Sequence, residues 1–121
     1  MDRQRHRASE APRGRRRIRG IAIGSRNAVE PAANLSAYNA SKAALLSLVQ
    51  TAALENKDLG ITANVILPAT MNTNANHKAN PGADPSKWVQ PERVAALVAF
   101  LASPAGAQIT GAAIPIYGQD L

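Results

Sequence analysis

The fold of this chain is decided by residues 18–67, which read IRGIAIGSRNAVEPAANLSAYNASKAALLSLVQTAALENKDLGITANVIL. Residues 18–24 are a short β-branched run that ends in glycine, as a buried strand does. Ser36 can cap a helix that runs to about Asp58. Residues 61–67 form a second short apolar run. A strand, a helix and a strand in this order predict two parallel strands joined by a right-handed crossover.

The segment after residue 67 predicts one more helix and one more strand. Residues 68–88 are expected to form a long polar loop, and residues 91–103 a helix with one apolar stripe. Residues 111–118 predict a third strand. The fold class is therefore α/β: a Rossmann-like parallel sheet of about three strands with helices on both faces. The helix over residues 36–57 is rich in Ala and Leu on most sides, so we expect it to be buried against the sheet and against another subunit.

The net charge of +6 comes from the first 20 residues, which carry eight arginines against Asp2 and Glu10. Residues 21–121 are neutral, so the basic pI indicates nothing about the partners of the folded part. Residues 1–17 have almost no apolar content and are expected to be a disordered tail, either solvated or not native to the fold. Arginines can neutralise phosphates, but the tail has no aromatic residue to stack on a base, so nucleic-acid binding is a distant alternative.

Cysteine is absent, which excludes disulfides and thiolate metal sites. The two histidines, His6 and His77, are too few and too scattered to form a metal cluster. No apolar run approaches the roughly 20 residues that span a bilayer. We therefore expect a cytoplasmic protein with no metal and no membrane segment.

The chemistry of the chain is indicated by Tyr38-Asn39-Ala40-Ser41-Lys42. A tyrosine and a lysine four residues apart share one face of a helix, and an ammonium beside a phenol favours the phenolate. Such a pair can act as a general acid or base. Ser25 follows the first strand, at the end of the sheet where open α/β folds bind their ligands. Its hydroxyl could polarise a carbonyl, so these residues predict a reductase of carbonyls or imines.

Residues 18–118 resemble the C-terminal, catalytic part of the short-chain dehydrogenase/reductase family. Four motifs in the family's order carry the resemblance: Ile21–Ser25, Ser36–Ala44, Asn64–Ala69 with Thr73, and Ile109–Gly111. It implies an oxidoreductase that uses NAD or NADP to reduce a C=O or C=N bond of a small molecule. The alternative is a catalytically inactive fragment that acts only by associating with other subunits through helix 36–57.

The resemblance also implies roles for individual residues. Tyr38 corresponds to the catalytic acid/base, and Ser25 to the residue that hydrogen-bonds the reacting carbonyl. Lys42 corresponds to the residue that holds the nicotinamide ribose and favours the ionised tyrosine. The loop at the nicotinamide end of the cofactor corresponds to Pro68, Met71 and Thr73. The family usually has glycine where this chain has Ala69, a mild departure if the φ angle of Ala69 is negative.

One segment narrows the subgroup. Residues 70–88 resemble the substrate loop of the dihydropteridine reductase branch in their Thr, the Asn before a basic pair, Pro-x-Ala-Asp and the Trp. Retention of Ser25 argues against a strict dihydropteridine reductase. Trp88 could contact the substrate, but packing within the loop is the favoured interpretation.

The glycine-rich turn that seats the cofactor pyrophosphate in this family has no match here. Gly14, Gly20 and Gly24 have neither of its spacings, and the family's Asn-Asn-Ala-Gly segment and fourth catalytic residue, an asparagine, have no match before Ser25. We therefore expect residues 18–121 to be a truncated Rossmann domain without its dinucleotide-binding half. The residue that would select NAD or NADP belongs to that half, so the sequence does not determine the choice.

Overall fold

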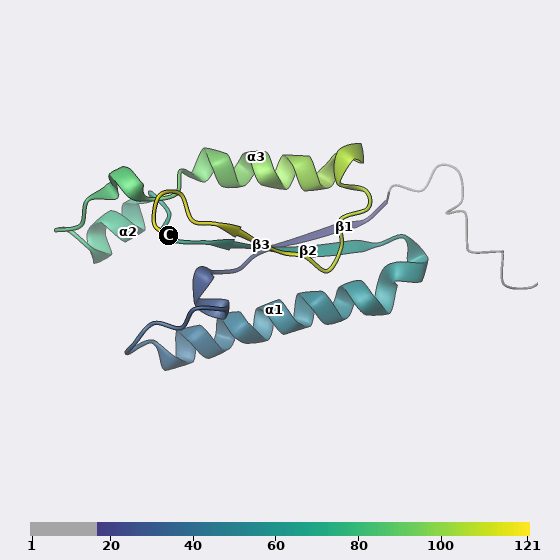
Figure 1. The fold of residues 1–121 in the computed structure, drawn as a ribbon, viewed down its shortest axis with the longest axis horizontal. Helices are drawn as coiled ribbons and strands as arrows, with labels where there is room; N and C mark the ends of the chain where they lie inside the picture. The colour runs from purple at the N-terminus through teal and green to yellow at the C-terminus, as the bar shows by residue number, and fades with distance from the viewer. Residues whose placement is uncertain (1–16) are drawn as a thin grey trace, which may run out of the picture.

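A computed structural model describes residues 17–121, in which a three-stranded sheet lies between two helices (Figure 1). The strands are β1 (Arg19–Ile23), β2 (Thr62–Pro68) and β3 (Ala113–Ile116), all parallel and in the order β1-β2-β3. The long helix α1 (Ser36–Asn56) lies on one face of the sheet, and α3 (Pro91–Ala102) lies on the other. The predicted α/β fold with a parallel sheet is confirmed.

Strand β2 is the centre of the molecule. Its register pairs Arg19 with Thr62 on one side and Val65 with Ala113 on the other, and all seven of its residues are buried. A parallel strand covered on both faces needs such a continuous apolar run. The carboxyl ends of β1 and β2 lie side by side, which brings the turn that begins at Ser25 next to the segment after Pro68.

The apolar stripe of α3 packs on the upper face of the sheet as predicted. Val94 and Leu101 are buried and form one core cluster with Ile66 of β2 and with Val89. Leu97 and Val98 pack against the same cluster. The helix begins at Pro91, which is suited to a first helical turn because its missing N–H would have no partner there.

One expectation for α1 needs correction. Ser36 is the first helical residue and not the cap, because Leu35 occupies the N-cap position and supplies no side-chain hydrogen bond. One face of the helix packs on the sheet, and Ala53 is buried there, whereas Leu48 and Leu54 are 66% and 70% exposed. Burial of the second face of α1 against another subunit stays a prediction.

The segment over residues 68–88 is not the uninterrupted loop that its composition predicts. It contains the short helix α2 (Asn74–Ala79) and a 3-10 turn, η3 (Pro85–Lys87). Each starts at a side-chain cap: Thr73 Oγ1 accepts the N–H of Asn76, and the Asp84 carboxylate accepts the N–H of Ser86. Capping of this kind stabilises short helical turns whose sequences show no apolar periodicity.

The arginine-rich tail predicted over residues 1–17 lies outside the described residues, apart from Arg17. Within residues 17–121, none of the helices combines the length and the apolar character that crossing a membrane requires.

Candidate active site

Ser25 is fixed at the carboxyl end of β1. It caps the 3-10 turn η1 (Arg26–Ala28): its Oγ accepts the N–H of Asn27 at 3.1 Å and donates to Asn27 Oδ1 at 3.2 Å. Gly24 brings the strand close to β2, since its N–H donates to the carbonyl of Ile66 and an added Cβ would lie 2.9 Å from Val65 Cγ2. The buried serine is therefore held on a tightly packed strand end.

Tyr38 and Lys42 lie on the same face of the first turns of α1, as their spacing predicts. The ammonium of Lys42 is 5.6 Å from the centre of the Tyr38 ring, within the range of a cation–π contact. The side chain of Tyr38 remains partly exposed, so its hydroxyl is accessible to a ligand. Both residues are oriented by a regular helix and not by a loop.

Two asparagines link the serine turn to the tyrosine helix. Asn27 Nδ2 donates to Asn39 Oδ1 at 2.8 Å, and Asn39 Nδ2 donates to the carbonyl of Ala32 at 2.8 Å. The N–H of Ala32 makes a longer contact with Asn39 Oδ1, at 3.4 Å. Asn39 is adjacent to Tyr38, so this pair joins the two predicted catalytic residues through hydrogen bonds.

The asparagine pair was not predicted from the sequence. The available signals were local: Asn39 lies inside the Tyr-x-x-x-Lys motif, and Asn27 follows Ser25 by two residues. At that distance, serine and asparagine side chains commonly bond to nearby backbone. The hydrogen bond between Asn27 and Asn39 joins residues 12 positions apart, so it could be recognised only once the fold was known.

Ser25 and Tyr38 line one open cavity of about 400 Å³. Pro68, Met71 and Thr73 line it as well, so five of the six predicted site residues meet there. Lys42 is not part of the lining and reaches the site through the Tyr38 ring. The remaining lining residues are Ile23, Gly24, Arg26, Asn27, Leu35, Ala69, Thr70, Asn76 and Asp120.

The loop after β2 is held in place by backbone hydrogen bonds. The N–H of Asn72 donates to the carbonyl of Val89 at 2.8 Å, and the N–H of Val89 donates to the carbonyl of Thr70 at 2.9 Å. Ala69, where the family usually has glycine, has a negative φ, because Asn34 is the one non-glycine residue of the described chain with a positive φ. Alanine is therefore accommodated at this position without strain.

Trp88 packs within the loop and does not line the cavity. Its ring centre is 5.2 Å from that of His77, and the two rings are inclined at 52°. His77 is exposed, and its Nε2 is hydrogen-bonded to Asn72 Oδ1. This geometry supports the packing interpretation of Trp88.

Arg26 and Asp120 are the charged residues among those that line the cavity. Arg26 donates a hydrogen bond to the Glu30 carboxylate, and this bond raises the pKa of Arg26, with Asp120 adding a smaller electrostatic contribution. Neither residue was predicted from the sequence as part of the site, since 94 positions separate them. The ring of Tyr117 lies against the guanidinium group of Arg26.

Comparison with known proteins identifies the family. Residues 7–118 match the family model described as enoyl-(acyl carrier protein) reductase. The chain belongs to the short-chain dehydrogenase/reductase family. The resemblance inferred from the four motifs is thus confirmed.

Individual members of the family are similar over most of this chain. The cyclic-di-GMP-binding biofilm dispersal mediator protein of Escherichia coli K12 is 38% identical over 106 residues, which cover 81% of this chain and 45% of that protein. The 3-ketoacyl-(acyl-carrier-protein) reductase of Brucella melitensis, complexed with NADH, has a TM-score of 0.75 at 26% identity, covering 87% of this chain and 45% of that one.

A blue fluorescent protein from a metagenomic library, in complex with NADPH, has a TM-score of 0.73 at 33% identity and covers 84% of this chain and 44% of that one. This chain therefore spans less than half the length of each of these three relatives. The two solved structures contain NADH in one case and NADPH in the other.

Proposed function

We propose that this chain carries the acid/base residues of an NAD(P)-dependent oxidoreductase that reduces a C=O or C=N bond of a small molecule. One observation carries the proposal: Ser25 and Tyr38, from two different elements, line a single cavity together with the loop after β2. A hydroxyl pair at the carboxyl end of a parallel sheet is suited to bind and protonate a carbonyl oxygen.

The proton chemistry follows from the two hydroxyl groups. The Tyr38 hydroxyl would donate its proton to the substrate oxygen or nitrogen, while Ser25 Oγ would hydrogen-bond the same atom. Ser25 now donates to Asn27 Oδ1 at 3.2 Å, a long hydrogen bond that a substrate oxygen can replace at small cost. The Lys42 ammonium beside the ring would stabilise the phenolate that remains.

The residues around the cavity fit the nicotinamide end of the cofactor. Pro68, Met71 and Thr73 would contact the nicotinamide, and Lys42 and Tyr38 would hold its ribose. When bound, the cofactor supplies the hydride. The cofactors of the two solved relatives support NAD or NADP without deciding between them.

The turn that would hold the pyrophosphate has no counterpart in these 121 residues. We propose that residues 18–121 form the catalytic half of a Rossmann domain, and that turnover needs a second half supplied by further polypeptide. The exposed Leu48 and Leu54 of α1 support association with another copy through residues 36–57. A cytoplasmic location, proposed because no apolar run of the sequence approaches the length that spans a bilayer, would be tested by cell fractionation.

For the substrate, we propose a C=O or C=N bond in a small molecule related to those of the dihydropteridine reductase branch. The support is the sequence of residues 70–88, and the retained Ser25 favours a carbonyl over a strict pteridine substrate. Comparing turnover of a quinonoid dihydropterin with turnover of a simple ketone tests this choice. Faster reduction of the ketone would agree with the oxidoreductase proposal and would contradict the relation to the dihydropteridine reductase branch.

The main experiment combines cofactor titration with one substitution. NADH and NADPH are titrated into the purified protein, alone and together with a polypeptide that supplies the family's glycine-rich half. If neither sample binds cofactor at millimolar concentration, this chain is not an active oxidoreductase, and the alternative of an inactive fragment is favoured.

Where turnover is measured, Tyr38→Phe should reduce it by about a hundredfold or more, as loss of a general acid does. Ser47→Ala is the control, because it removes a hydroxyl from an exposed position on the same helix that does not line the cavity. Turnover unaltered by Tyr38→Phe would refute the assigned mechanism.

A further inference from the structure

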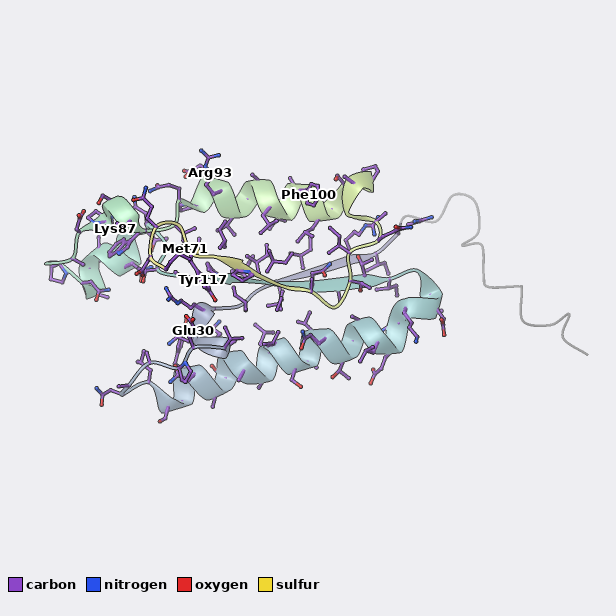
Figure 2. All side chains as sticks on the ribbon, viewed as in Figure 1. Glu30, Met71, Lys87, Arg93, Phe100 and Tyr117 are labelled. Carbon is purple, nitrogen blue, oxygen red and sulfur yellow. The ribbon has the colours of Figure 1, made fainter. Side chains whose placement is uncertain are left out.

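One side chain, Arg26, joins the turn after β1 to the segment after β3. Its Nη1 donates to the backbone carbonyl of Asp120 and lies 3.8 Å from the Asp120 carboxylate. Its guanidinium carbon is 4.5 Å from the centre of the Tyr117 ring, and its Nε donates to Glu30. Figure 2 shows Tyr117 and Glu30 at the same end of the sheet, and Arg26 contacts both of them.

We call residues Tyr117–Asp120 the strap. The strap is a turn, in which the N–H of Asp120 donates to the carbonyl of Tyr117. Gly118 has a φ of 65°, and an added Cβ would lie 3.0 Å from the carbonyl oxygen of Lys87. The N–H of Gln119 faces the same Lys87 oxygen at 3.4 Å. The strap therefore lies between Arg26 and the segment that ends the loop after β2.

The strap is also part of the cavity. Asp120 lines it together with Arg26, Ser25 and Tyr38. Arg26 is the residue directly after Ser25, so the side chain that retains the strap comes from the same turn that orients the serine hydroxyl. If the strap left this position, the cavity would lose one of its walls.

We infer that Arg26 is a positioning residue which holds the strap as a wall of the cavity, and that this wall limits the size of the carbonyl compounds that can reach Ser25 and Tyr38. The inference rests on the proposed function in one respect, which is that this cavity binds the substrate. Arginine suits the role because its planar guanidinium donates to Glu30 through Nε and to the Asp120 carbonyl through Nη1, while its face stacks on Tyr117. Lysine could keep the charge attraction but not the fork or the stacking.

The position of the strap can be measured without any cofactor. In Arg26→Ala, we expect the amides of Gln119 and Asp120 to exchange with deuterium about fivefold faster or more, because the segment is held by few other contacts. The backbone of Trp88, the one tryptophan of the chain, adjoins Gly118 of the strap, so acrylamide should quench the indole fluorescence more strongly. Arg26→Lys should give an intermediate effect.

Arg93→Ala is the matched control, because it removes the same side chain from an exposed position on α3 (Figure 2). It should leave both measurements unchanged. Equal exchange of Gln119 and Asp120 in Arg26→Ala and the wild type would overturn the inference, since the arginine would then not hold the strap.

The effect on substrate size is tested with two ketones, the small cyclohexanone and the bulky camphor, bound to each variant and followed by NMR shifts of the Ser25 and Tyr38 amides. Arg26→Ala should raise the affinity for camphor relative to cyclohexanone about fivefold or more, and Arg93→Ala should leave the ratio unchanged. An unchanged ratio in Arg26→Ala, or no binding of either ketone to the wild type, would overturn the inference. Ketone binding without turnover would leave it standing and refute only the proposed activity.

Discussion

Replacing Asn39 by alanine tests whether the asparagine pair holds the serine turn. In the wild type, Asn39 Oδ1 accepts a hydrogen bond from Asn27 Nδ2, and Asn39 Nδ2 donates to the carbonyl of Ala32. Asn39→Ala removes both bonds together with the longer contact from the N–H of Ala32. Asn27, which supports the Ser25 hydroxyl, would then be free to reorient.

The expected cost can be worked from these contacts. Two good hydrogen bonds contribute about 0.5–1.5 kcal/mol each, and water can replace the lost partners because this region is only partly buried. The contact at 3.4 Å adds little, and alanine returns about 0.5 kcal/mol through its higher helix propensity. We expect Asn39→Ala to lower the free energy of unfolding by about 1 kcal/mol, which leaves the protein folded.

Asn39→Asp separates the two functions of this side chain. The carboxylate keeps the acceptor for Asn27 Nδ2 but loses the donor to the Ala32 carbonyl. A negative charge in the first turn of α1 also interacts favourably with the helix dipole, by about 0.3–1 kcal/mol. We therefore expect Asn39→Asp to retain the orientation of Asn27 and Asn39→Ala to lose it.

The assay is NMR of the Asn27 side-chain amide, together with urea unfolding of each variant. In Asn39→Ala, the Asn27 Nδ2 protons should exchange faster with water and shift, while Asn39→Asp should keep them protected. Asn74→Ala, the same change at an exposed position on α2, is the control for stability. If the Asn27 amide and the unfolding midpoint of Asn39→Ala match those of the wild type, the asparagine pair does not hold the turn.

Two further predictions concern other parts of the chain. Asn64 is 1% exposed and hydrogen-bonds two backbone groups of the segment before β3. Asn64→Leu should therefore lower the free energy of unfolding, measured in urea, by about 2–4 kcal/mol. A decrease of less than about 1 kcal/mol would contradict this prediction. The N–H of Ser86, followed by its hydroxyl, lowers the pKa of Asp84. The stabilisation is therefore present above the unfolded pKa of about 3.9 and is lost as pH falls through the lower folded pKa. Trp88 fluorescence should follow this acid transition in the wild type and show a smaller one in Asp84→Ala, and equal transitions would exclude the cap as its source.

The sheet could be predicted from sequence because its signal is continuous. The apolar runs at residues 18–24, 61–67 and 111–118 contain most of β1, β2 and β3, and the Pro91 helix ends within one residue of the expected position. Burial on both faces produces such runs, so composition alone is enough to find them.

The errors lie where a single side chain determines the structure. Helix α2 and the turn η3 depend on caps at Thr73 and Asp84, which periodicity does not register. The apolar face of α1 that contains Leu48 shows a different limit, because such a face has the same sequence whether the same chain or another one covers it. Local composition therefore does not determine which chain covers this face of the helix.

The candidate site shows which long-range contacts a sequence can indicate. Ser25 and Tyr38 were found because strand ends and helix spacing are local features. No local sequence pattern indicates the contact between Arg26 and Asp120, but the order of the strands in the sheet does. Parallel strands end at the same edge of a sheet, so whatever follows β3 emerges at the same edge as the turn after β1. With one strand between them, these two ends are about 10 Å apart, a distance that the long arginine side chain and the strap can bridge from opposite sides. A long charged side chain within a few residues after the first of three parallel strands, with an oppositely charged one a few residues after the third, is therefore a pattern that predicts a contact across the opening of the site.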